Sequence, residues 1–239
     1  MSIETAAPSK SRRAGPAFRL SGRATVILMA VLGIAAVWAT DQIVPAATDR
    51  EAQVRLWLAA RAAGNVTLVL LAFQISLGLI LSHPTNKSTW KLSKRIFPWH
   101  EHLWVFVMAF MAVHVAAIVL DPYARVSALG AIVPGLSEYR SSAVALGTIA
   151  LYAFVITAVT ARWTKLLPPG IWLKIHRLAL VVFVFAWLHA ELAGSDSGVL
   201  AWLYVGTGLA VLVSGFYRYW ASRQRRPTFT TSLAEVTES

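Results

Sequence analysis

The chain has 239 residues, of which 57% are hydrophobic and only 14% are charged, and its mean hydropathy of +0.60 is typical of a membrane protein. It contains no cysteine, which excludes disulfides, thiolate metal sites, iron–sulfur clusters and a thiol nucleophile. The formal net charge of +11 would suit a nucleic-acid-binding protein, but the basic residues lie between apolar segments, so we expect no nucleic-acid partner.

Six apolar segments are long enough to cross a bilayer, since a helix needs about 20 apolar residues to span about 30 Å of hydrocarbon. They lie at 24–45, 62–82, 99–120, 142–161, 171–193 and 198–220. The sequence therefore predicts an all-α integral membrane protein whose six-helix bundle fills residues 24–220, with no room for a second folded domain.

The two ends of the chain, residues 1–23 and 221–239, are basic and polar, and we expect both to be disordered. The first apolar segment follows the basic stretch KSRR, as a secretory signal would. Its spanning length favours a retained membrane anchor instead.

The placement of basic residues predicts the orientation of the helices. Of the 22 Lys and Arg residues, 17 lie in the two ends and in the second and fourth connections. The positive-inside rule then places both termini in the cytoplasm, and we expect a bacterial-type inner membrane. The third and fifth segments both begin on the cytoplasmic side, so His100 and His176 lie near the inner face and His114 and His189 near the outer face.

The third segment contains HEHLWVFVMAFMAVH, in which His100 and His114 are 14 residues apart. This spacing gives a rise of about 21 Å and falls only about 40° short of four turns, so the two share a helix face. His102 lies about 120° from His114 and fits less well. In the fifth segment His176 and His189 are 13 residues apart and point about 140° apart on a straight helix, so a bulge or different rotamers must absorb the difference.

Histidines at two depths on two helices predict a cofactor. Imidazole is a strong axial ligand for haem iron, and one imidazole from each of two helices gives a six-coordinate b-type haem. We therefore predict two haems, between the third and fifth helices and about 20 Å apart along the membrane normal, which would form a path for electrons.

Two other interpretations of the histidines stay open. A metal-binding transporter would use them for a divalent ion, although ligands for one ion must converge on one point. A single intramembrane histidine is often only a hydrogen-bonding residue between helices, and we favour this interpretation for His83 and His102.

Three segments resemble the ferric reductase-like transmembrane domain, which occurs in ferric reductases, NADPH oxidases and the haem-binding subunit of the bacterial methionine sulfoxide reductase system. WHEHLWVFVMAFMAVH and IWLKIHRLALVVFVFAWLHAELAGSD resemble its third and fifth helices. RAAGNVTLVLLAFQISLGL resembles its second, with an Arg and a Gly near the start. The likeness covers residues 57–195 and implies that His100 pairs with His176 and His114 with His189.

The resemblance also implies the partners. Full-length oxidases of this family continue after the sixth helix into flavin and nicotinamide domains, whereas the stretch 221–239 that follows Trp220 here is short and contains no GxGxxG motif. We therefore expect no fused FAD or NAD domain, and a separate flavoprotein reductase or membrane quinol as electron donor. Ferric chelates, dioxygen or an outer-side reductase are all compatible acceptors.

Haem propionates are negatively charged and need basic or polar partners at each face. The residues available are Lys94, Arg95 and Arg177 on the inner side, and Arg61, Arg140 and Tyr139 on the outer side. Each is equally well explained as an ordinary interfacial anchor.

Overall fold

The computed structural model describes residues 48–82, 90–168, 170–195 and 198–223, together with Ala24, Ile27 and Val31. The rest of the predicted first span and of the two ends lies outside the described residues. The described elements are α2 (Asp49–Leu81), α3 (Trp90–Leu120), α4 (Ala128–Ile132), α5 (Ser141–Arg162), the 3₁₀ helix η1 (Thr164–Leu166), α6 (Ile171–His176), α7 (Ala179–Ala193) and α8 (Ala201–Arg223). Among these residues there is no strand, which confirms the all-α class.

Four of the described segments are long and apolar enough to cross a membrane. They are α2, α3 from Lys91 onward, α5, and α6 with α7 taken together as Ile171–Ala193. They correspond to the second to fifth predicted spans. Helix α8 is long enough at 23 residues, but Gly, Thr and Ser are spread along it and it contains no equally apolar stretch. A count of six membrane helices therefore stays a prediction.

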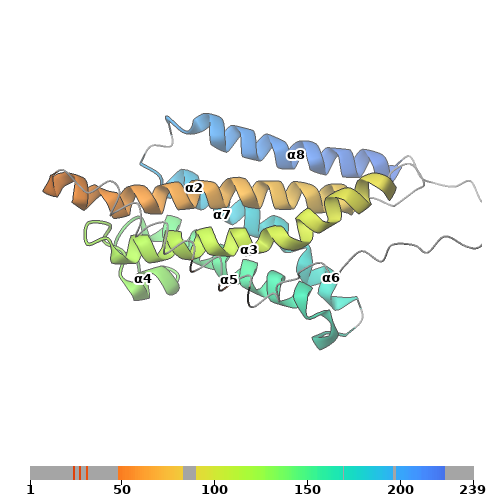
Figure 1. The fold of residues 1–239 in the computed structure, drawn as a ribbon, viewed down its shortest axis with the longest axis horizontal. Coiled ribbons are helices and arrows are strands. Elements are labelled where there is room, and N and C mark those ends of the chain that lie inside the picture. Colours follow the sequence, from red (N-terminus) through yellow and green to blue (C-terminus); the bar gives the residue numbers. More distant parts are fainter. Residues whose placement is uncertain are drawn as a thin grey trace, which may run out of the picture.

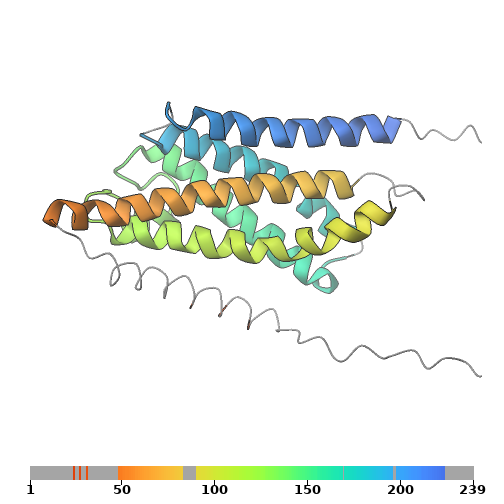
Figure 2. The same ribbon diagram turned by 45° about the horizontal axis from the view of Figure 1, so that its top comes forward.

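Helix α2 is central to the bundle. It lies between α8 on one side and α3 on the other, as Figures 1 and 2 both show, and it also contacts α7. Helix α3 packs mainly on α2, and α5 packs mainly on α7. The start of α2 is fixed by Thr48, whose side chain accepts a hydrogen bond from the Glu51 backbone N–H at 3.2 Å.

Helix α3 bends near its start, where Pro98 lies two residues before His100. Proline has no backbone N–H, so the carbonyl of Lys94 loses its helical partner, and the ring pushes the helix out of line. The first turns of α3, yellow in Figure 1, accordingly lean away from the rest of the helix.

The predicted fifth span is interrupted between α6 and α7. Here the backbone N–H of Leu178 donates to the carbonyl of Ile175 at 2.9 Å, and that of Leu180 donates to the carbonyl of Arg177 at 3.3 Å. These three-residue bonds are typical of a 3₁₀ turn, which rotates about 20° more per residue than an α-helix. The tightened turn reduces the angle between His176 and His189, so it supplies the distortion that their spacing requires.

A buried apolar cluster fills the middle of the bundle, between the two histidine levels. Val107 of α3 and Val182 of α7 are its most deeply buried members, and Leu71 of α2 and Phe154 of α5 pack with them. Since Val107 lies midway between His100 and His114 along α3, the cluster separates the two levels.

Candidate functional site

The structure brings the four histidines together as two pairs, in the pairing that the family resemblance implies. The ring centres of His100 and His176 are 6.0 Å apart with their planes at 89°, and those of His114 and His189 are 6.2 Å apart with their planes at 77°. One ring of each pair comes from α3, and the other comes from α6 or α7.

These separations fit two imidazoles on opposite sides of one metal ion. An imidazole nitrogen binds a metal at about 2 Å and the ring centre lies about 1 Å further back, so two such ligands have centres about 6 Å apart. Among the described residues, no group of three or more His, Cys, Asp or Glu side chains could hold a metal ion. Each level therefore offers two imidazole side chains, the number of donors that a bis-histidine haem requires.

Three of the four histidine rings are fixed by hydrogen bonds to a neighbouring helix. The Nδ1–H groups donate to backbone carbonyls of Gln74, Ala60 and Ala143, at 3.1 Å from His100, 2.7 Å from His114 and 2.8 Å from His189 respectively. Because a carbonyl can only accept, Nδ1 carries the hydrogen and Nε2 keeps its lone pair for a metal.

A glycine lies four residues after each of these acceptors, at Gly64, Gly78 and Gly147. A Cβ atom added there would lie 2.9 Å from Nδ1 of His114, 3.0 Å from Cε1 of His100 and 2.7 Å from Nδ1 of His189, respectively. Any other residue would therefore push the ring away from its carbonyl. One signal of this role is present in the sequence, because Gly64 and Gly78 have the same spacing as the two histidines that they face.

His176 is the exception among the four. Its Nδ1 atom is buried and has no hydrogen-bond partner within the part of the chain that the structure describes. The ring packs beside Trp172, one turn earlier on α6, with the ring centres 6.0 Å apart. His176 is also the last residue of α6, immediately before the tightened turn.

Each histidine pair opens into a cavity. The cavity of about 900 Å³ is lined by His100 and His176, and the cavity of about 260 Å³ is lined by His114 and His189. We name them the inner and the outer cavity after the orientation that the positive-inside rule predicts. Leu71, Phe154 and Val182 line both cavities and form an apolar wall between them.

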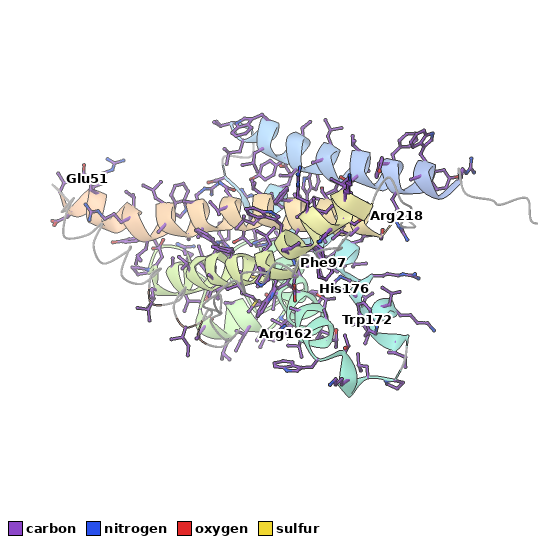
Figure 3. All side chains as sticks on the ribbon, turned by 45° about the vertical axis from the view of Figure 1, so that its right-hand side comes forward. Glu51, Phe97, Arg162, Trp172, His176 and Arg218 are labelled. Atoms are coloured by element: carbon purple, nitrogen blue, oxygen red, sulfur yellow. The ribbon has the colours of Figure 1, made fainter. Side chains whose placement is uncertain are left out.

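Several basic residues reach the inner cavity. Arg177 and Lys94 line it, and so do Arg162 and Arg218. Figure 3 shows Arg162, Arg218, Trp172 and His176 at the same end of the bundle, far from Glu51. Sequence reasoning did not place Arg162 or Arg218 at the cavity, because each position depends on how the ends of α5 and α8 come together. Arg95 is exposed and is not among the lining residues.

The outer cavity has a smaller set of polar residues. Arg61 lines it together with Tyr139, donates from Nη1 to Ser195 Oγ at 3.1 Å, and lies over the ring of Trp57. Arg140 is not among the lining residues. Its Nη1 donates to the backbone carbonyls of Leu192 and Gly194, at 2.6 and 2.9 Å, where it caps the end of α7.

The other two histidines differ from these four. His102 is exposed, and its Nδ1–H donates to the carbonyl of Pro98 on its own helix at 2.7 Å. It therefore takes no part in either ring pair. His83 lies outside the described residues.

Comparison with protein families gives one match. The family described as ferric reductase like transmembrane component matches residues 63–187, just over half of the chain. The matched range includes His100, His114 and His176 and ends two residues before His189. Comparison with curated proteins and with solved structures finds no match. The chain therefore belongs to the ferric reductase-like transmembrane family.

Proposed function

We propose that this integral membrane protein binds two b-type haems, one in each cavity, and carries electrons between the two faces of the membrane. Domains of its family generally bind haem, and membrane electron transfer is the activity that membership indicates. The observation that carries the proposal is the pair of histidine rings at each of two levels, about 6 Å apart at both.

The packing of the helices also suits a planar cofactor. Helix α3 packs on α2, and α7 packs on α5, whereas α3 makes hardly any close backbone contact with α6 or α7. The helices that carry the histidines therefore face each other across a gap, into which the imidazoles project. A flat macrocycle lying between the two rings of each pair would fill this space.

Haem would supply a one-electron step between ferric and ferrous iron. His100 with His176, and His114 with His189, would be the axial ligands, and the Nδ1 bonds of three of them keep Nε2 available. Arg177, Arg162 and Arg218 would neutralise propionates in the inner cavity, and Arg61 would do so in the outer one. The apolar wall of Leu71, Phe154 and Val182 excludes water between the levels.

We further propose that electrons move outward. Basic residues gather at the inner cavity and at the ends of α5 and α8, which supports a cytoplasmic location for that end. The donor would be a separate flavoprotein reductase or a membrane quinol. The acceptor would be a ferric chelate, dioxygen or an outer-side reductase, with both termini of the chain in the cytoplasm.

An absorption spectrum of the purified protein tests the proposal. We expect a sharp Soret band that shifts on reduction with dithionite, an α band typical of six-coordinate haem b, and two haems per chain. A colourless protein that binds zinc or copper stoichiometrically would instead establish the metal-transporter alternative.

A further inference from the structure

We propose that Gly64, Gly78 and Gly147 are positioning residues, which leave room for three haem-ligating imidazoles to donate to backbone carbonyls. We propose also that the methyl group of Ala161 prevents His176 from making the corresponding hydrogen bond. His176 is then the axial ligand most easily displaced, which makes the inner haem site the one that exchanges ligands. This inference rests on the proposed haem function and concerns how the protein holds each imidazole.

The first step is a geometric rule that the structure repeats three times. In an α-helix the carbonyl of residue n points toward the N–H of residue n+4, so the side chain of n+4 stands beside that carbonyl. The carbonyl has a second lone pair, which can accept an imidazole N–H that approaches from the side. Only glycine at n+4 leaves room for the ring, as the 2.7–3.0 Å approaches to Gly147, Gly64 and Gly78 show.

The second step locates the corresponding position for His176. On α2 the acceptors for His114 and His100 are Ala60 and Gln74, whose spacing along the helix equals that of the two histidines. On α5 the acceptor for His189 is Ala143. Thr157 lies close to four helical turns further along α5, and Ala161 lies one turn beyond Thr157. Thr157 and Ala161 both line the inner cavity together with His176, so this turn of α5 faces the ring.

The third step compares residue 161 with the three glycines. Ala161 carries a methyl group where the other three positions have glycine, and the Thr157 carbonyl accepts the hydroxyl of Thr160 at 3.3 Å. The Nδ1 atom of His176 is correspondingly buried without a partner in the described structure. The outer site therefore has two imidazoles whose Nδ1–H groups donate to a backbone carbonyl, whereas the inner site has one among the described residues. We call such an imidazole supported.

A supported imidazole is a better ligand, because the hydrogen bond fixes the ring orientation and raises the basicity of Nε2. His176 lacks this bond and ends a short helix of six residues. A small neutral ligand such as carbon monoxide should therefore replace His176 at the inner ferrous site. Nε2 would leave with its lone pair and carbon would donate another, so no electron or proton is transferred. His114 and His189 should resist the same exchange.

Carbon monoxide titration of the dithionite-reduced holoprotein tests this inference by optical difference spectroscopy. We expect the wild-type protein to bind one carbon monoxide for every two haems. Ala161→Gly should open a path for His176 to the Thr157 carbonyl, since the Thr160 hydroxyl keeps its shorter bond of 2.7 Å to the carbonyl of Ile156. Carbon monoxide binding should then weaken by about 10-fold or more, the usual size of effects from residues that support a metal ligand. Gly147→Ala should displace His189 from Ala143 and make the second haem reactive as well.

Ala145→Gly is the matched control, because it places the same flexible residue in α5 at a half-buried position that lines neither cavity. Equal binding to both haems of the wild type, binding to neither, or an Ala161→Gly variant that behaves like Ala145→Gly would each overturn the inference. If Gly147→Ala loses haem altogether, Ala161→Gly still decides the question. A protein without haem would refute the proposed function itself, whereas two haems that are both inert to carbon monoxide would refute only the inference.

Discussion

At the scale of single residues, the candidate site depends on small side chains as much as on histidines. The sequence identifies the histidines because their spacing follows the helical repeat, and the structure places them in pairs, although their role as haem ligands stays a prediction. The function of Gly64 or Gly147 cannot be deduced in the same way. It depends on which neighbouring helix presents an imidazole, and that is a property of packing between helices.

The choice between His100 and His102 gives a prediction at this scale. His100→Ala removes a ring that faces His176 and Gln74, so the inner haem should be lost and the haem content per chain should fall by about half, since two haems are proposed. His102→Ala is the control, because that ring is exposed and its Nδ1–H donates to the carbonyl of Pro98 within α3. Haem content measured against protein concentration checks both variants. The opposite result, with His102 required and His100 dispensable, would show that the ligand assignment on α3 is wrong.

At the scale of helices, the membrane segments were the most predictable part of the fold. The second to fifth predicted spans agree with the candidate spans of the structure to within a few residues at six of their eight ends. The exceptions are the starts of α2, at Asp49 and not residue 62, and of α3, at Trp90 and not residue 99. The length of each apolar segment decides where such helices form, so their positions can be predicted from the sequence alone.

The sequence also required a distortion between His176 and His189 but could not say which kind. No Pro or Gly marks the tightened turn at Arg177 and Leu178.

Lengthening that turn by one residue gives a prediction for α6. An alanine inserted between Leu178 and Ala179 would rotate α6 relative to α7 by about 100° and shift it by about 1.5 Å. Helix α7 is held by its packing on α5, so α6 should move. We expect the inner haem to be lost while the outer haem, held by His189, remains.

An insertion beside Gly135 is the control for this experiment. That residue lies between α4 and α5, and a Cβ atom added to it would meet no atom of the described residues within 4 Å. It should leave both haems in place. Haem content and the absorption spectrum distinguish the variants. An insertion at 178 that leaves the spectrum unchanged would show that α6 does not orient His176.

At the scale of the whole molecule, the bundle has two halves. One contains α2 and α3, the other contains α5, α6 and α7, and α8 packs on α2. Each proposed haem lies between the halves, with one level toward each membrane face. The apolar wall of Leu71, Phe154 and Val182 separates the levels, so an electron that crosses the membrane would visit both haems in turn.

The direction of transfer can be tested in oriented vesicles. His189→Ala removes one ligand of the outer haem and leaves His100 and His176 intact. With a donor on the cytoplasmic face and a membrane-impermeant ferric chelate on the other, chelate reduction should collapse while the inner haem is still reduced. His102→Ala vesicles should transfer electrons as the wild type does. If His189→Ala instead blocks reduction by the donor, the orientation is inverted and the two haems exchange roles.

The division of each histidine pair between the two halves of the bundle sets the order in which the pairs can form during biosynthesis. The chain is made from its N-terminus, so α3 enters the membrane with His100 and His114 before their partner rings, His176 and His189, have been synthesised. The inner pair cannot form until residue 176 has been synthesised, and the outer pair must wait for residue 189. Loading of the proposed haems would then be a late step that follows insertion of the second half, and it would join two hairpins that are already in the bilayer.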